Sequence, residues 1–307
     1  MIKAERLTKR YDSLTAVDDV SFSVAPGEVL GFLGPNGAGK TTTMRMIAGF
    51  LPPTSGTASI NGHDVEADPI AARRCLGYLP EGAPSYGEMT VEGFLRFIAD
   101  LRDLHGSTRR QRMDEVVGRL ALQGVLGQTI DTLSKGFRRR VGIAQAILHD
   151  PPVLIMDEPT DGLDPNQKHE VRRLIADMAR DKIIVISTHI LEEVDAVCTR
   201  AIIIAKGRVV ADETPAALAR RSRYHDAISV RFADSNAMLA ARDALQSVPG
   251  YSGCDADGHK LQLTVFGSFA GQGPATVKAR LDQRDIAVMD MRLEQGRLDD
   301  VFRSITA

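Results

Sequence analysis

The chain has 307 residues, of which 43% are hydrophobic and 25% charged, and its 38 basic and 40 acidic side chains leave a formal charge of -2. This length predicts about two domains, and the near-neutral charge gives no electrostatic case for nucleic acid as a partner. Three cysteines lie far apart without metal-ligand spacing, which is typical of a reducing compartment. No apolar run approaches the ~20 residues of a membrane-spanning helix. We therefore expect a cytoplasmic protein that reaches a membrane only through a partner.

The first part of the chain predicts strands of two kinds. Residues 2–7 and 20–24 alternate apolar and polar side chains, as half-exposed antiparallel strands do, and residues 57–61 are a candidate for another. Residues 29–33 are instead apolar throughout, which favours a strand buried on both faces. Three later runs share this character, at residues 153–156, 183–186 and 202–204. The sequence thus predicts a largely parallel sheet with helices on both sides.

A glycine-rich turn follows the apolar run at 29–33 and precedes a helical pattern at residues 42–48. Its sequence is Gly34-Pro35-Asn36-Gly37-Ala38-Gly39-Lys40-Thr41, which fits the P-loop pattern G-x-x-x-x-G-K-[ST]. Glycines let backbone N–H groups close around phosphates, and the helix N-terminus adds partial positive charge. Lys40 is placed to reach the outer phosphates and Thr41 to offer its hydroxyl to Mg²⁺. An ordinary glycine-rich turn is the alternative; the full motif in this context favours a nucleoside triphosphate site.

The pattern is helical from Thr90 to about residue 126. Thr90 is a candidate N-cap. One helical face carries four apolar side chains that predict a buried stripe, Phe94, Leu95, Ile98 and Leu101. Two basic clusters, at residues 109–112 and 138–140, are interpreted as solvated helix faces rather than as a groove for nucleic acid.

The apolar run at 153–156 ends in Asp157-Glu158-Pro159. The carboxyl end of a buried strand places both carboxylates at the edge of the sheet, beside the P-loop. Asp157 is predicted to hold Mg²⁺, directly or through water, and Glu158 to polarise the attacking water as a general base, a role typically worth ~10²–10⁴-fold. Acidic strand ends are common, so this pair indicates a nucleotide site only together with the P-loop upstream.

A tight turn at Lys206-Gly207 and a helix start at Thr214-Pro215 lead to a predicted domain border at residues 220–223, where the pattern changes. Beyond it the sequence predicts a strand near 228–232, a helix at 236–248, a strand at 261–265 and a helix at 275–281. A last strand is predicted after residue 285, but its apolar residues do not all lie on one face. Ile286 and Val288 share one face, and Met289, Met291 and Leu293 share the other. Either a bulge between the two groups or burial of the strand on both faces would explain this pattern. We expect a small α+β unit, for which a ferredoxin-like order of elements is a candidate.

Several segments, taken in chain order, resemble those of the ATP-binding subunit of an ABC transporter: the P-loop, Leu133-Ser134-Lys135-Gly136-Phe137, Asp157-Glu158, residues 161–165 and Ser187-Thr188-His189. Residues 77–81 and 298–302 make the chain most similar to type-2 exporter ATPases, including the gliding-motility and multidrug-like kinds. The resemblance implies an α/β P-loop NTPase fold. It would comprise a RecA-like parallel core, an antiparallel β subdomain and a helical subdomain at about 82–150, all within residues 1–222, followed by an accessory α+β domain at 223–307.

The resemblance also implies roles for single residues. It assigns nucleotide contacts to Gly34, Pro35, Asn36, Gly37, Ala38, Gly39, Lys40, Thr41 and Thr42. Tyr11 matches the aromatic side chain that stacks on adenine, with an ordinary edge-strand tyrosine as the alternative. Ser134 and Gly136 match residues that hold the γ-phosphate of ATP bound to the opposite subunit. Ser134 is also a natural N-cap, and the two roles are compatible.

Three further matches carry alternatives of their own. His189 matches the switch histidine that contacts the γ-phosphate and orients the water, although a lone histidine after a strand is usually structural. Asp164 matches a residue that links the two nucleotide sites across a dimer, and aspartate is also favoured in such a turn. Glu81 stands where many members have a glutamine near Mg²⁺; a carboxylate binds the metal but adds negative charge beside a triphosphate. Lys135 and Phe137 replace the commoner glycine and glutamine of the signature.

The resemblance implies an enzyme, an ATPase whose two copies close head to tail on two molecules of ATP with Mg²⁺. Closure and hydrolysis would power export through separate transmembrane permease subunits that touch residues 81–101, which makes the protein peripheral on the inner face of the membrane. The alternative is a soluble ABC-type regulatory ATPase not tied to a membrane partner, such as one acting on ribosomes or DNA. Those proteins usually carry two nucleotide domains or a long coiled coil, whereas this chain has one P-loop and no sustained heptads.

Overall fold

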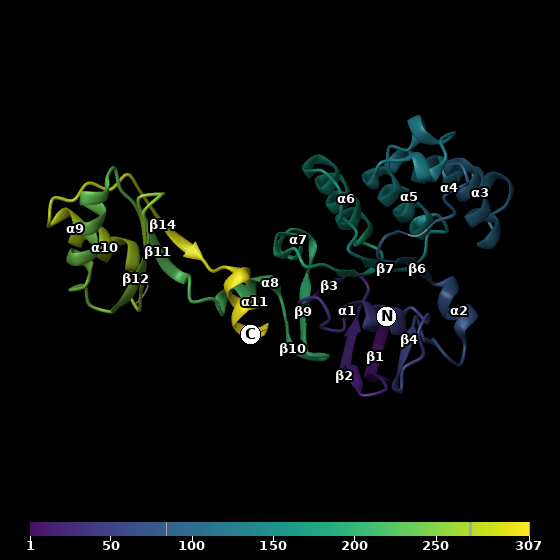
Figure 1. Ribbon diagram of the computed structural model, residues 1–307, viewed down its shortest axis with the longest axis horizontal. Helices are drawn as coiled ribbons and strands as arrows, with labels where there is room; N and C mark the ends of the chain where they lie inside the picture. The colour runs from purple at the N-terminus through teal and green to yellow at the C-terminus, as the bar shows by residue number, and fades with distance from the viewer. Residues whose placement is uncertain (84, 270–271, 307) are drawn as a thin grey trace. The chain divides into compact units, whose positions relative to one another are not determined.

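A computed structural model describes residues 1–83, 85–269 and 272–306 (Figure 1). Internal contacts divide the chain into two compact units, Met1–Pro215 and Ala216–Ile305. None of the described helices is long and apolar enough to cross a membrane.

A six-stranded sheet forms the centre of the first unit, in the order β10-β9-β3-β8-β7-β6. Its strands are β3 (Val29–Leu33), β6 (Leu76–Leu79), β7 (Val153–Asp157), β8 (Ile183–Ser187), β9 (Arg200–Ala205) and β10 (Arg208–Glu213). Every position of β3, β7 and β8 is buried, and the strands pair in parallel except for β10 at the edge. The continuous apolar runs are thus confirmed as strands of a largely parallel sheet.

The N-terminal strands form an antiparallel sheet in the order β2-β1-β4-β5. They are β1 (Ile2–Tyr11), β2 (Leu14–Val24), β4 (Ser55–Ile60) and β5 (His63–Asp64). Helix α1 (Lys40–Ile47) shares one apolar core with this sheet and with the parallel sheet. In that core the rings of Phe22 and Phe32, one from each sheet, lie 5.0 Å apart between centroids. The parallel sheet is covered on its other face by α7 (Leu191–Val197), which meets β3 at Gly31.

Helices fill the segment between β6 and β7: α3 (Val91–Leu101), α4 (Gly106–Arg119) and α5 (Lys135–Ile147), with short 3-10 turns at Gln123–Val125 and Ile130–Thr132. The Thr90 cap is confirmed, because its hydroxyl accepts the N–H of Gly93 at 3.1 Å. The buried stripe of α3 is only partly as predicted. Phe94 and Leu95 are buried. Leu101 is 64% exposed, because it is the last residue of the helix and lies beyond the part that packs against the core.

The basic clusters are not solvated helix faces throughout, and this prediction is wrong for three arginines. Arg139 and Arg140 of α5 are buried, and Arg140 donates to the carbonyl of Leu120 at 3.0 Å. Arg112 donates to the last carbonyls of α5, those of Ile147 and Leu148, at 2.9 and 3.0 Å. The reason is that a helix end leaves carbonyls without partners, and a guanidinium offers several donors to satisfy them.

The boundary between the units falls at the first residue of α8 (Pro215–Arg220), and the second unit contains a four-stranded antiparallel sheet in the order β12-β13-β11-β14. Its elements follow as β11 (His225–Arg231), α9 (Ser235–Leu245), β12 (Tyr251–Asp257), β13 (Gln262–Gly267), α10 (Gly273–Asp282), β14 (Asp290–Gln295) and α11 (Leu298–Thr306). Helices α9 and α10 pack on one face of the sheet around a separate core (Figure 1). This order is that of the ferredoxin-like fold, so the expected α+β unit is confirmed.

The two explanations offered for the last strand are both wrong. The strand begins only at Asp290, and Ile286 and Val288 pack against the core from the loop before it. Met289 and Leu293 are 65% and 50% exposed and so do not form a second buried face, whereas Met291 packs against the same core as Ile286 and Val288. The last strand, β14, pairs with β11, and the register of this pair is irregular between residues 225 and 228 of β11. The bulge was expected elsewhere, between residues 286 and 293.

Candidate functional site

The P-loop lies between β3 and α1, at the carboxyl edge of the parallel sheet. Gly39 has a φ of +104°, and a Cβ there would lie 2.5 Å from the carbonyl oxygen of Ala16, so only glycine fits. No side chain caps the first turn of α1, and that turn holds no acidic residue. Its N–H groups are therefore available to an anion, and the site fits the phosphates of a nucleotide.

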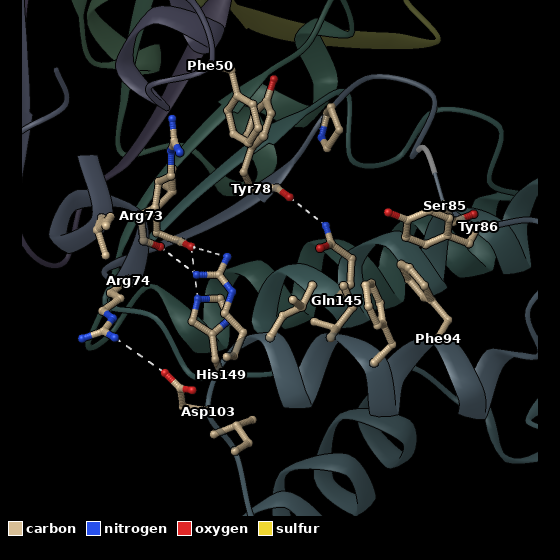
Figure 2. A pocket seen from close by; sticks show the side chains of 18 of the residues that line it. Phe50, Arg73, Arg74, Tyr78, Ser85, Tyr86, Phe94, Asp103, Gln145 and His149 are labelled. Atoms are coloured by element: carbon tan, nitrogen blue, oxygen red, sulfur yellow. Dashed lines mark hydrogen bonds and ion pairs between the residues drawn. The ribbon is translucent and has the colours of Figure 1, made fainter.

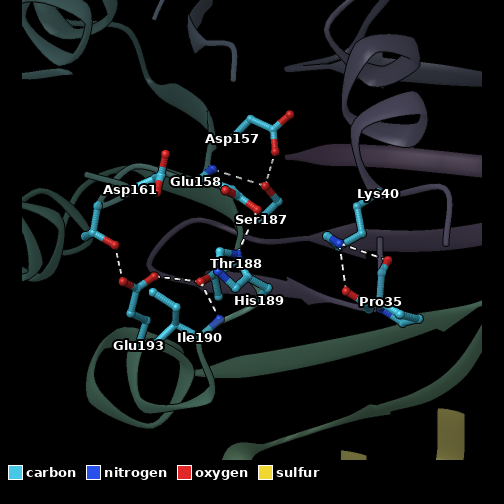
Figure 3. Close-up of polar contacts among 12 residues, drawn as sticks. Pro35, Lys40, Asp157, Glu158, Asp161, Ser187, Thr188, His189, Ile190 and Glu193 are labelled. Atoms are coloured by element: carbon cyan, nitrogen blue, oxygen red, sulfur yellow. Dashed lines mark hydrogen bonds and ion pairs between the residues drawn. The ribbon is translucent and has the colours of Figure 1, made fainter. Parts of the chain in front are cut away.

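Lys40 begins α1 and is only 7% exposed. Its Nζ donates to the carbonyls of Gly34 at 2.7 Å and Pro35 at 3.2 Å (Figure 3). Burial lowers the pKa of Lys40, and the nearby carboxylates of Glu158, Asp157 and Glu81 act in the opposite direction. The fold thus brings three of the predicted acidic residues, from two distant segments, into the electrostatic range of the P-loop lysine.

Asp157 ends β7 and is 1% exposed. Its Oδ1 accepts the hydroxyl of Ser187, whereas its Oδ2 has no hydrogen-bond partner among the described residues. A buried carboxylate oxygen without a partner is unfavourable, and a hard divalent cation or a water bound to it supplies the missing contact. The first turn of α1 adds the hydroxyl of Thr41, so the oxygen donors present fit Mg²⁺.

Glu158 and His189 form the contact at the centre of the site. Glu158 Oε1 lies 2.9 Å from His189 Nδ1, and their side chains are 19% and 54% exposed. Because an ionised carboxylate only accepts hydrogen bonds, this contact places the imidazole proton on Nδ1. The backbone N–H of Glu158 donates to the carbonyl and the hydroxyl of Ser187 at 3.1 and 3.2 Å, which fixes the residue at the end of its strand.

Two residues that support this pair were missed by sequence reasoning. Arg139, from α5, donates to the carbonyl oxygen of Asp157 at 2.5 Å and also to that of Glu158, and burial lowers the pKa of its guanidinium. In the sequence it is one of three successive arginines, and no signal distinguishes it from its neighbours. Ser187 bridges Asp157 and Glu158; its place at the end of a buried strand was visible, but its partners were not.

The signature segment and residues 161–167 lie together. Ser134 caps α5 by accepting the N–H of Phe137 at 3.3 Å, and Asp164 caps α6 (Pro165–Met178) by accepting the N–H of Gln167 at 3.0 Å. A Cβ on Gly136 would lie 2.5 Å from Gln167 Oε1. The capping alternative for Ser134 is thus confirmed, and Asp164, for which the alternative was a turn residue, caps the helix that follows that turn. Among the described residues, no hydrogen bond links Ser134 or Gly136 to the P-loop of the same chain.

The remaining predicted residues are accessible. Tyr11 ends β1, is 46% exposed, and has Lys9 Nζ 5.4 Å from its ring centroid. Glu81 is exposed in the turn after β6, and Thr42 is half-buried in α1 beside Thr41. Pro35, Asn36 and Gly37 are exposed on the P-loop, and Ala38 is buried beneath it.

A cleft of about 1350 Å³ opens elsewhere on the first unit, between α2 (Pro69–Arg74), α3 and β6 (Figure 2). Four of its apolar side chains are more than half exposed, Phe50, Ile70, Tyr86 and Leu101. Among the described residues its charged lining is mostly basic, with Arg45, Arg73, Arg74 and Arg102, and includes one acid, Asp103, which pairs with Arg74 at 3.6 Å.

The floor of the cleft is uncharged near neutral pH. Burial raises the pKa of Tyr78 to about 12. Burial, with the charge of Arg102, lowers the pKa of His149 to about 4, and His149 Nε2 lies 3.1 Å from the carbonyl oxygen of Leu76. The cleft therefore offers an apolar surface with a cationic rim.

Comparison with known proteins gives consistent findings. The family model described as ABC transporter matches residues 17–161. The probable multidrug ABC transporter ATP-binding protein YbhF of Escherichia coli is 36% identical over 216 residues, which is 70% of this chain but only 37% of that protein. The Nod factor export ATP-binding protein I of Paraburkholderia xenovorans is 34% identical over 308 residues, covering 99% of this chain and 96% of that protein.

The dimeric structure of MJ0796, a bacterial ABC transporter cassette, has the same fold with a TM-score of 0.66 at 24% identity, and covers 70% of this chain and 99% of its own. The resemblance inferred from the motifs and the predicted P-loop NTPase fold are both confirmed. On these grounds the chain belongs to the ABC transporter family of ATP-binding proteins.

Proposed function

We propose that this protein is the ATP-binding and ATP-hydrolysing subunit of an ABC exporter. The observation that carries the proposal is the Glu158–His189 contact of 2.9 Å, placed beside the buried P-loop lysine. A base that activates water, a histidine that orients the base and a cation that binds phosphate are together able to catalyse hydrolysis of a γ-phosphate.

In the proposed reaction, water attacks the γ-phosphorus in line with the leaving ADP, and Glu158 takes the proton of that water. His189 donates from Nδ1 to Glu158 and so orients the carboxylate. Lys40 and the N–H groups at the start of α1 stabilise the charge of the phosphates. Mg²⁺, held by Thr41 and Asp157 with Glu81 close by, would neutralise the same charge when bound.

We infer that the site is completed by a second copy of the chain, as in the dimeric cassette to which this fold is similar. In this dimer Ser134 and Gly136 of one subunit would cap the γ-phosphate bound to the P-loop of the other, at the N-terminus of α5. The absence of a hydrogen bond from Ser134 to the described P-loop residues of its own chain agrees with a role in trans. Asp164 would link the two sites, and Tyr11, on its exposed strand end, would stack on adenine.

Substitutions at Ser134 separate its role as a cap from its role toward phosphate. Aspartate and asparagine both cap helices well, so Ser134→Asp and Ser134→Asn should keep α5 intact. A carboxylate facing a phosphate is repelled, and we expect the turnover of Ser134→Asp to be lower than that of Ser134→Asn by about tenfold or more. Steady-state ATPase assays of the two variants make the comparison, with thermal melts to verify that both fold. Equal turnover would remove Ser134 from the site.

We further propose that a separate transmembrane permease subunit docks in the cleft and holds the protein at the inner face of the membrane. Exposed apolar side chains gathered over a hollow are typical of an interaction site. The cationic rim favours a docking segment with acidic residues at the ends of an apolar stretch. Part of the lining, including Tyr86, Phe97 and Leu101, falls within the residues 81–101 expected to touch the permease.

The docking proposal is tested with two leucines of equal exposure. Leu101, in the cleft, and Leu14, in β2, are both 64% exposed. Leu101→Glu places a charge on the apolar surface and should weaken co-purification with the permease about tenfold or more, because a buried unpaired charge opposes association. Leu14→Glu should co-purify as the wild type does. Loss of binding in both variants, or in neither, would contradict the assignment. Co-purification with nucleic acid instead of a membrane protein would favour a soluble regulatory ATPase.

A further inference from the structure

Glu193 is a buried carboxylate that the proposed reaction does not use. It lies in α7 and is 1% exposed. Its Oε1 accepts the hydroxyl of Thr160, and its Oε2 accepts the hydroxyl of Thr188 at 2.7 Å (Figure 3). Arg172 of α6 comes within 3.9 Å of the same carboxylate. A buried carboxylate is unfavourable unless it is hydrogen-bonded and paired, so these contacts fix its position.

The two threonines belong to different loops. Strands β7 and β8 pair in parallel up to Asp157 and Ser187, and beyond that pair their ladder ends. The loop after β7 carries Glu158 and then Thr160, and the loop after β8 carries Thr188 directly before His189. Glu193 therefore bridges the two loops where the backbone ladder no longer holds them together.

The bridge also shapes the turn that presents the histidine. The hydroxyl of Thr188 that donates to Glu193 accepts the N–H of Ile190 at 3.0 Å. The peptide group that follows His189 is thus tied to the side chain of the residue that precedes it, and Glu193 orients that side chain. Freeing this hydroxyl would let the turn change its conformation, and the imidazole would move with it.

We propose that Glu193 is a positioning residue for ATP hydrolysis. It sets the separation of the two loops and thereby keeps Glu158 and His189 in contact, acting through Thr160 and Thr188. The proposal rests on the hydrolytic function proposed above. The bridge also connects His189 to the segment from Thr160 to Asp164, which we propose to lie at the dimer interface. If that segment moves when the dimer closes, Thr160 moves Glu193, and Glu193 in turn moves Thr188 and His189.

The first test is Glu193→Ala in the full-length chain, assayed for steady-state ATP turnover. Misplacing a catalytic group by about 1 Å lowers rates as much as ~10²-fold, so we expect kcat to fall by about ten- to a hundredfold. ATP is bound by other residues, and the KM for ATP should change by less than about twofold. The matched control is Glu192→Ala, the exposed neighbour on the same helix, which should behave as the wild type.

The threonines provide a second test that does not depend on whether Glu193→Ala folds. Thr160→Val and Thr188→Val remove only the hydroxyls, and Thr160→Ser and Thr188→Ser retain them. We expect the valine variants to lose kcat at unchanged KM and the serine variants to recover most of it. The two valine changes should also be non-additive, because they break one bridge.

The outcomes separate this inference from the proposed function. A wild-type chain that hydrolyses ATP, with unchanged kcat in folded Glu193→Ala or equal rates in the valine and serine variants, would overturn the role of Glu193 alone. A wild-type chain without ATP turnover, tested with Mg²⁺ and the permease, would overturn the proposed function and this inference with it.

Discussion

Glu158→Gln is expected to lower ATP turnover by about 10²–10⁴-fold, the contribution typical of a general base, while ATP binding is retained. Glutamine has the same shape, and its carbonyl oxygen accepts the Nδ1–H of His189 as the carboxylate does. What it lacks is the ability to take a proton from the attacking water. Because hydrolysis is needed to reopen the proposed dimer, the variant should accumulate as an ATP-bound dimer.

Turnover is measured by phosphate release, and the dimer by light scattering with and without ATP. Glu170→Gln is the matched control, because Glu170 is an exposed glutamate on α6 and its substitution removes the same charge without touching the site. Normal turnover in Glu158→Gln would exclude Glu158 as the base. Loss of turnover without formation of a dimer would still support Glu158 as the base, but it would contradict the proposal that ATP closes two chains on each other.

Local patterns were enough to predict most elements of the first unit. Continuous apolar runs marked β3, β7, β8 and β9 because strands buried on both faces need apolar residues at every position. The P-loop was visible because its glycines, its lysine and its hydroxyl are contiguous in the sequence. Thr90 was predicted as a cap from residues within one helical turn. In each case the physical requirement is met by neighbours along the chain.

The supporting residues could not be found in this way because their partners are distant in sequence. Ser187 contacts Asp157 only because the register of β7 and β8 places them side by side. Arg139 was interpreted as a solvated arginine, yet it reaches the carbonyls of a strand end that lies beyond its own helix. Glu193 follows another glutamate, and only the helix position decides which of the two is buried. Strand β12 was not predicted either, since most of its side chains are half-buried and show no alternation.

Lys40→Ala should weaken the binding of ATP itself, which distinguishes it from Glu158→Gln. Hydrogen bonds to charged groups are worth about 1.5–3 kcal/mol, which corresponds to an increase in Kd of about ten- to a hundredfold. The expected loss has a second cause in the local charges. The carboxylates of Asp157, Glu158 and Glu81 all act on Lys40, and without the ammonium group their negative charge would face the triphosphate uncompensated.

Isothermal titration with ATP, Mg²⁺ and the full-length chain measures the change directly. The variant Lys40→Met serves as a second test, because it keeps the apolar stem that packs in the loop and removes only the charge. Lys3→Ala, at an exposed position of β1, removes a lysine of the same unit away from the site and should bind ATP as the wild type does. Unchanged affinity in both Lys40 variants would contradict the phosphate-binding role of the P-loop. A large loss in Lys40→Ala with normal affinity in Lys40→Met would attribute the effect to packing of the loop rather than to the charge.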